Sequence, residues 1–175
     1  IRESLISGFE TLYTWGRSPH QSNNQLFKIE NNFLLCKTYE EQSGLITVAI
    51  HNRSVDMLLG WINSKIKTVS LYKKIKINAL EKFVKKNREY GGSKSYETSI
   101  GGVRKILQAL RSKDAICFAA DQVPQKGLGK YIKLYNRDAY TTTLVQSLAV
   151  KTGAPVLYTY ILSLIHISEP TRLVS

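Results

Sequence analysis

The chain has 175 residues, of which 43% are hydrophobic, so it can bury the core of one ordinary domain, and this composition argues against intrinsic disorder. Its formal net charge of +12 favours an anionic partner such as a phospholipid surface, an acidic protein or a nucleic acid. Cys36 and Cys117 each lie among apolar neighbours, which is typical of buried thiols and argues against a disulfide framework.

The hydrophobic pattern along the chain alternates between helical and extended segments. Residues 45–50 form a nearly continuous β-branched and apolar run, as in a strand buried on both faces of a parallel sheet. Gly44, just before it, suits the position after a helix C-terminus. Helices are expected at 1–14, 55–66, 78–88, 99–110 and 141–152, strands at 45–50, 68–71, 115–120, 131–134 and 155–161, and a strand followed by a helix within 23–39.

This alternation predicts an α/β domain with a mostly parallel central sheet flanked by helices. No run reaches the roughly 18 consecutive apolar residues of a membrane-spanning helix, and we expect no leader with a charged segment followed by an apolar one at the start of this sequence. Because the first residue is Ile1 rather than Met, we expect the chain to be part of a longer protein that continues beyond it at both ends.

The strand at 45–50 ends at His51, and Asp56 follows five positions later in the first turn of the next expected helix. Open α/β sheets place their ligand sites at the carboxyl ends of the strands, where these two side chains could form a hydrogen bond. A neutral imidazole can take a proton from a substrate hydroxyl while a carboxylate fixes its tautomer. The spacing alone equally allows a polar cap at His51 and an ordinary first-turn acid at Asp56.

Five blocks in a fixed order give the chain a resemblance to the bacterial lipid A biosynthesis acyltransferases, the lauroyl and myristoyl transferases of the late acylation steps. The resemblance extends over nearly all of residues 1–161. Its blocks are the strand with the H-x4-acid pattern at 44–56, the helix end at 87–91, and the segments 102–110, 118–122 and 141–156.

The resemblance implies that His51 and Asp56 form a catalytic dyad and that Arg88 and Asp121 line the same site. Arg88 would hold a phosphate or position the acceptor, which suits a planar guanidinium. Arg53 is a further candidate for substrate binding. Read without the family, Arg88 is one more charge on a basic helix and Asp121 is a turn or helix cap.

The resemblance also implies the reaction and its partners. An acyl group would pass from an acyl carrier protein thioester to a hydroxyl of a lipid A precursor, with no cofactor or metal, at the cytoplasmic face of the bacterial inner membrane. Residues 65–88 carry nine basic side chains and the single acid Glu81, which suits both an acidic carrier protein and an anionic membrane surface. The membrane anchor is expected outside this chain.

Two other functions are compatible with parts of the sequence. The wording Asn52-Arg53-Ser54-Val55-Asp56 leans toward the H-x-S-x-x-D motif of glycerolipid acyltransferases, although the serine falls one place later and their phosphate-binding block is absent. A nucleic-acid-binding module would suit the basic charge and the ten tyrosines. The chain has no recognisable nucleic-acid-binding signature, however, so we expect no nucleic acid partner.

Residues 162–175 break the pattern of the domain. The segment from Leu162 to Arg172 is similar to the in-frame translation of a sequencing adapter. We therefore expect the acyltransferase domain to cover 1–161 and the last residues to form a non-native tail, in which His166 has no role.

Overall fold

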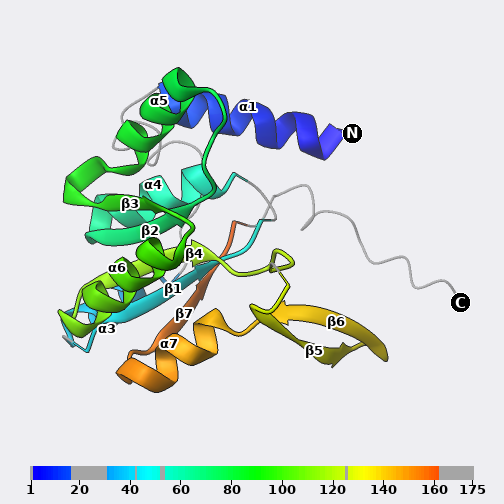
Figure 1. Cartoon of the computed structure of the whole chain (residues 1–175). Helices are drawn as coiled ribbons and strands as arrows, with labels where there is room; N and C mark the ends of the chain where they lie inside the picture. Colours follow the sequence, from blue (N-terminus) through cyan, green and yellow to red (C-terminus); the bar gives the residue numbers. More distant parts are fainter. Residues whose placement is uncertain (1, 17–30, 42, 52–53, 125, 162–175) are drawn as a thin grey trace, which may run out of the picture.

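A computed structural model of the chain describes residues 2–16, 31–41, 43–51, 54–124 and 126–161. Its helices are α1 (Arg2–Gly16), α3 (Asn32–Glu40), α4 (Val55–Lys65), α5 (Asn78–Arg88), α6 (Ile100–Arg111) and α7 (Leu144–Thr152), with a short 3₁₀ helix at Tyr90–Gly92. Its strands are β1 (Leu45–Ala49), β2 (Thr68–Tyr72), β3 (Lys94–Glu97), β4 (Ala115–Ala119), β5 (Gly129–Leu134), β6 (Arg137–Thr142) and β7 (Val156–Thr159) (Figure 1).

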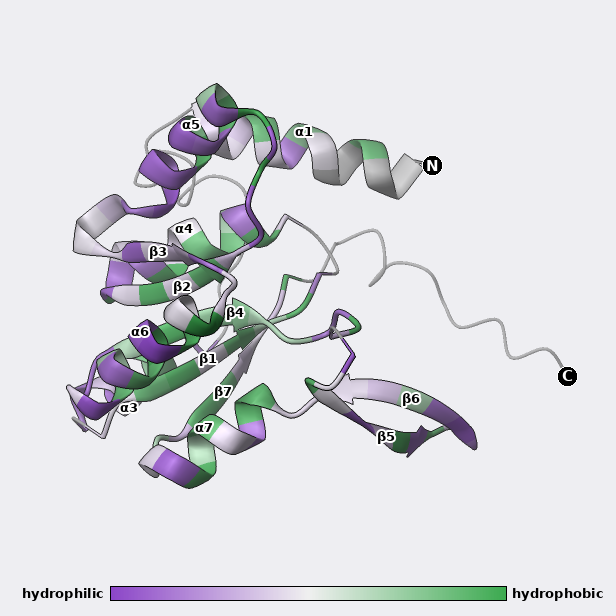
Figure 2. Ribbon diagram, viewed as in Figure 1, coloured by the Kyte–Doolittle hydropathy of each residue, from purple (hydrophilic) through white to green (hydrophobic). Residues whose placement is uncertain are grey.

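Five strands form one parallel sheet in the order β3-β2-β4-β1-β7. All five residues of β1 are buried, as the continuous apolar run predicts for a strand covered on both faces. Helices flank the sheet, so the predicted α/β class is confirmed (Figure 1). In Figure 2 the strands β1, β4 and β7 are mostly hydrophobic, whereas α5 is mostly hydrophilic.

The core has two parts, one on each face of the sheet. Alternate residues of β1 point to opposite sides: Leu45 and Ala49 pack with α3 and α4, whereas Ile46 and Val48 pack with α6 and α7. Serine side chains cap the starts of α4 and α6. Ser54 accepts a hydrogen bond from the backbone N–H of Met57 at 3.3 Å and so caps α4.

Several sequence-based boundaries need correction. Gly44 has φ 77° but lies at the entry to β1, because α3 already ends at Glu40. The expected strand at 131–134 is half of an antiparallel hairpin, β5–β6, that is separate from the main sheet. Because β6 extends to Thr142, α7 begins at Leu144 rather than at 141.

Two strands differ from what the sequence predicts or lie beyond the part of the chain that the structure describes. Strand β3 has no strong β-propensity signal and was not expected, since its sequence Lys94-Ser-Tyr-Glu97 is mostly polar. The strand expected near 23–30 lies outside the described residues. Within the described ranges, no helix combines the length and the apolar character needed to cross a membrane.

Candidate active site

The parallel register between β1 and β4 brings His51 and Asp121 together. Ala49 and Ala119 are paired across the two strands, and each is followed two positions later by one of these polar residues. Both therefore lie at the carboxyl edge of the sheet, where open α/β sheets bind their ligands. The sequence places both residues in one site, and the structure brings them into direct contact.

Asp121 makes two hydrogen bonds with His51. Its Oδ2 accepts from the His51 backbone N–H at 2.7 Å, and its Oδ1 lies 2.6 Å from the ring Nδ1. Partial burial alone would raise the pKa of Asp121, but the hydrogen bonds from the ring and backbone of His51 outweigh it and lower that pKa. Because an ionised carboxylate can only accept, Nδ1 carries a proton, and in the neutral ring the free lone pair is then on Nε2.

Gln122 is a third member of this group. Its Nε2 lies 3.4 Å from Nε2 of His51, at the edge of hydrogen-bonding distance. An amide N–H there can donate to the unprotonated ring nitrogen, which supports the same tautomer. Gln122 was not predicted as a site residue, although its position directly after Asp121 was a usable signal.

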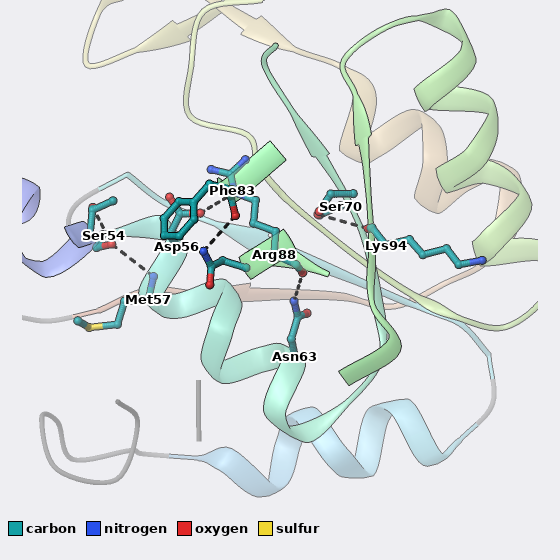
Figure 3. Close-up of polar contacts among 11 residues, drawn as sticks. Ser54, Asp56, Met57, Asn63, Ser70, Phe83, Arg88 and Lys94 are labelled. Carbon is teal, nitrogen blue, oxygen red and sulfur yellow. Dashed lines mark hydrogen bonds and ion pairs between the residues drawn. The ribbon is translucent and has the colours of Figure 1, made fainter. Parts of the chain in front are cut away.

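Asp56 has a different partner from the one the sequence suggests. Its Oδ1 accepts from Nε of Arg88 at 2.5 Å, and the Asp56 side chain is only 11% exposed. Figure 3 shows Arg88, at the end of α5, directed toward Asp56 in the first turn of α4. Among the described residues, His51 and Asp56 share no hydrogen bond. Asp121 is thus paired with His51, whereas Asp56 is paired with Arg88.

Side-chain contacts hold Arg88 and the start of α4 in place. Asn63 donates from Nδ2 to the Arg88 carbonyl oxygen at 2.9 Å (Figure 3). The guanidinium lies 6.0 Å from the centre of the Tyr72 ring, within the range of a cation–π interaction. The hydroxyl of Thr11 on α1 lies 3.0 Å from that of Ser54, which joins α1 to the same corner of the fold.

An open cavity of about 470 Å³ adjoins the His51–Asp121 pair. Ile50 and Asp121 contribute to its walls, and most of its other lining residues are apolar or carry a methyl group. Those residues come from the ends of β1, β4 and β7, from the end of β6, and from α7: Val48, Ala49, Ala120, Thr141, Thr142, Val145, Gln146, Ala149, Val156 and Tyr158. The cavity is therefore mostly apolar, and at Asp121 it borders the polar His51–Asp121 pair.

The sequence profile of the family described as bacterial lipid A biosynthesis acyltransferase matches residues 4–163. The match covers most of the chain and includes every residue of the site described above. The chain belongs to the bacterial lipid A biosynthesis acyltransferase family. A comparison with curated protein sequences found no significant match.

The family assignment gives the geometry a chemical setting. The His51–Asp121 pair of this family member adjoins a mostly apolar cavity. Arg53, which the sequence suggested as a further substrate-binding residue, lies outside the described residues. No group of three or more His, Cys, Asp or Glu side chains in the described part of the chain could hold a metal ion.

Proposed function

We propose that this chain transfers a fatty acyl group from an acyl carrier protein thioester to a hydroxyl of a lipid A precursor, in a late acylation step. The observation that carries the proposal is the His51 ring, hydrogen-bonded to Asp121 through Nδ1 beside an apolar cavity. In this arrangement Nε2 is the available base. Family membership supports acylation in lipid A biosynthesis as the overall reaction.

The reaction follows from the state of the His51 ring. Nε2 takes the proton of the acceptor hydroxyl while the hydroxyl oxygen attacks the thioester carbonyl carbon. The ionised carboxylate of Asp121 stabilises the imidazolium that forms. When the tetrahedral intermediate collapses, the C–S bond breaks, and the departing thiolate receives the proton from Nε2. The products are an ester and a free thiol, and no protein nucleophile is needed.

Asp56 and Arg88 have a proposed role in acceptor binding. The Asp56 carboxylate fixes the guanidinium through Nε, which leaves the terminal nitrogens available for a bidentate contact with a phosphate. Lipid A precursors are phosphorylated sugars, so this contact would hold the acceptor near His51. The direct orientation of His51 by Asp56 stays a prediction, and so does the contribution of Arg53.

The cavity is the proposed site of the acyl chain. Its walls are apolar over most of their area, and each methylene group that leaves water gains about 0.8 kcal/mol. An acyl chain seated there would place its thioester at the mouth of the cavity, next to Asp121. This geometry favours a long-chain acyl donor over a short one.

The basic surface of α5 and the loop before it supports the proposed acidic partners. Lys82 and Lys86 are exposed on α5, and three more exposed cations precede the helix at Lys73, Lys74 and Lys76. Positive charge at this density attracts an acidic carrier protein and an anionic bilayer. We propose that the enzyme works at the cytoplasmic face of the bacterial inner membrane.

The test is a transfer assay with labelled acyl–acyl carrier protein and a lipid A precursor that lacks its secondary acyl chains. Wild-type protein should form the acylated lipid, and His51→Ala should reduce the rate about 10²- to 10⁴-fold while leaving the fold intact. A lysophospholipid acceptor is the matched alternative substrate. Preferential acylation of that acceptor would replace the lipid A assignment with a glycerolipid one.

A further inference from the structure

The β5–β6 hairpin is the part of the described fold that lies outside the five-stranded sheet. It extends away from the body beside the start of α7 (Figure 1). A two-stranded hairpin is marginally stable on its own in water and normally buries one face against another layer. Here β5 is exposed over almost its whole length, so its side chains show what kind of surface the hairpin presents.

The two faces of the hairpin differ. On one face Tyr131 and Tyr140 are paired with their ring centres 5.0 Å apart, and Lys133 forms an ion pair with Asp138 at 2.9 Å. The Tyr140 hydroxyl also accepts from the backbone N–H of Gly127 at 2.8 Å. The polar groups of this face are therefore matched within the hairpin and the loop that leads into it.

The opposite face is apolar at its centre and cationic around it. Strand alternation places Ile132, Leu134 and Ala139 on this side together with Lys130 and Arg137. Ile132 and Leu134 are 48% and 54% exposed. Neither Lys130 nor Arg137 has a carboxylate partner among the described residues. The turn that joins the strands carries Tyr135, which is 94% exposed.

This apolar face leads to the proposed acyl site. Thr141 lies on the same side of β6 as Ala139, and it also lines the cavity that adjoins Asp121. A molecule seated on Ile132 and Leu134 would thus lie on the face of the hairpin whose other end, at Thr141, lines the cavity. Strand β6 thus runs from the cavity lining at Thr141 to the tip of the hairpin.

We propose that this face of the β5–β6 hairpin inserts into an anionic phospholipid surface and so places the cavity at the membrane where the lipid acceptor lies. Aliphatic side chains with a rim of Lys and Arg and an exposed Tyr have the composition of an interfacial segment. The cations contact the phosphate headgroups, and the aliphatic side chains enter the acyl boundary. The proposal rests on the proposed function, since it assigns a lipid surface to that site.

The first experiment measures cosedimentation of the full chain with vesicles, with no acyl donor or acceptor present. Vesicles of phosphatidylethanolamine with phosphatidylglycerol supply the anionic surface, and pure phosphatidylcholine supplies the neutral one. Leu134→Asn should weaken partitioning about tenfold, because the aliphatic group no longer leaves water. Val150→Asn is the control, since Val150 is 80% exposed on α7, away from this face.

A second pair of variants tests the charges. Lys130→Gln with Arg137→Gln should weaken binding to the anionic vesicles about fivefold for each cation removed. Arg104→Gln with Lys105→Gln removes the same charge from exposed positions on α6 and should change binding much less. Circular dichroism and urea unfolding of every variant show whether it is folded and stable, so that weaker vesicle binding can be distinguished from unfolding.

A third measurement uses the turn itself. Tyr135→Trp places an indole at a highly exposed position, and lipids brominated along their acyl chains should quench its fluorescence on vesicle binding. If wild type does not bind anionic vesicles, or if Leu134→Asn binds as wild type does, the proposal is wrong. If Leu134→Asn loses acyl transfer from acyl carrier protein but binds vesicles as wild type does, the face binds the carrier protein instead, and the lipid proposal is wrong.

Two results separate this proposal from the proposed function. A chain that binds vesicles through the hairpin yet transfers no acyl group would refute the reaction and leave the lipid surface in place. His51→Ala should bind vesicles as wild type does, because His51 lies outside this face. If Leu134→Asn instead converts a dimer to a monomer in sedimentation velocity without affecting vesicle binding, the face is a contact between two copies and the proposal fails.

Discussion

His51 and Asp121 face each other because the residues before them, Ala49 and Ala119, are paired in the register of β1 and β4. This relationship fixes which ring nitrogen faces the carboxylate. Because the ionised carboxylate accepts from Nδ1, Nε2 is the nitrogen that we propose as the base. One pair of neighbouring parallel strands thus brings together the proposed base and its carboxylate partner, from positions 70 residues apart in the chain.

Removal of the Asp121 carboxylate should impair catalysis through the state of His51. Asp121→Asn keeps the shape but loses the charge that stabilises the imidazolium, so kcat should fall by about 10²- to 10⁴-fold. The pH profile of kcat/KM should shift as well, which a purely structural role would not produce. Steady-state kinetics across pH provide both values.

Gln122→Leu is the matched comparison for that variant. It removes only the longer contact to Nε2, so its effect on kcat should be smaller than that of Asp121→Asn. If Asp121→Asn retained wild-type kcat and pH dependence, the carboxylate would have no part in orienting the base.

The lowered pKa of Asp121 predicts how stability changes in acid. Because the folded state holds the pKa below the ordinary Asp value of about 3.9, the ionised carboxylate stabilises the fold above that ordinary value. This contribution is lost as the pH falls through the lowered folded pKa. Urea unfolding between about pH 5 and pH 2 should therefore show a steeper loss of stability for wild type than for Asp121→Asn.

The origin of this pH effect can be tested in a second background. In His51→Phe the ring donor is gone and only the backbone N–H donates to Asp121. In that background, the pH dependence of stability should differ less between the protein with Asp121 and the protein with Asp121→Asn. An undiminished difference would mean that the ring does not lower the pKa of Asp121.

The central strands of the sheet, unlike β3 at its edge, were predictable from the sequence because they carry strong local signals. The run at 45–50 is apolar except at Thr47, and the run at 115–120 is apolar throughout, as is typical of buried parallel strands. The hairpin was harder to predict. Its turn uses Tyr135 and Asn136 at φ 47° and 62°, where Asn-Gly would have been the recognisable signal.

The pairing within the site depends on strand order, which local sequence does not encode. His51 and Asp56 are close in sequence, so a contact between them was the natural expectation. The structure instead places β4 beside β1, which brings Asp121 to His51, and directs Arg88 from α5 to Asp56. The family resemblance predicts that these four residues share one site, and the structure joins them as two pairs, His51 with Asp121 and Asp56 with Arg88.

The Asp56–Arg88 pair should contribute to stability and to acceptor binding. Its side chains are 11% and 22% exposed, so removing one partner leaves a partly desolvated charge without its counterpart. Asp56→Asn and Arg88→Met should each destabilise by about 1–3 kcal/mol, and the double variant should lose less than the sum. Urea unfolding of the four proteins gives the coupling energy.

Kinetics of the same variants separate the two roles of Asp56. If Asp56 acts through Arg88, Asp56→Asn should raise KM for a phosphorylated acceptor more than it lowers kcat. A large fall in kcat with a shifted pH profile would instead support the direct contact with His51 that the sequence predicts. Additive stability effects would show that the pair is not coupled in solution.

Two neighbouring glycines of α6 should respond oppositely to alanine. A Cβ on Gly102 would clash with the backbone oxygen of Glu97 and lie 3.0 Å from Leu71, so Gly102→Ala should destabilise by about 1–3 kcal/mol. A Cβ on Gly101 would meet only Ser99 Oγ at 3.6 Å. Gly101→Ala should therefore stabilise by about 0.5–1 kcal/mol, the usual gain in a helix.

Thermal and urea unfolding of the two variants check this difference directly. Gly101→Ala is the control for any general effect of alanine in α6, because it lies in the same helix turn. Equal stabilities for the two variants would contradict the close packing of α6 against the end of β3.

The two thiols should differ sharply in reactivity. Cys117 is fully buried in β4, and desolvation raises its pKa to about 11, so only about one molecule in a thousand carries its thiolate at pH 8. Cys36 on α3 is partly exposed. A thiol reagent should therefore modify Cys36 in the folded protein and reach Cys117 only when the sheet opens. Cys36→Ser should abolish the fast phase, and Cys117→Ser should keep it. Rapid labelling of Cys117 in folded Cys36→Ser would contradict its burial between the two faces of the core.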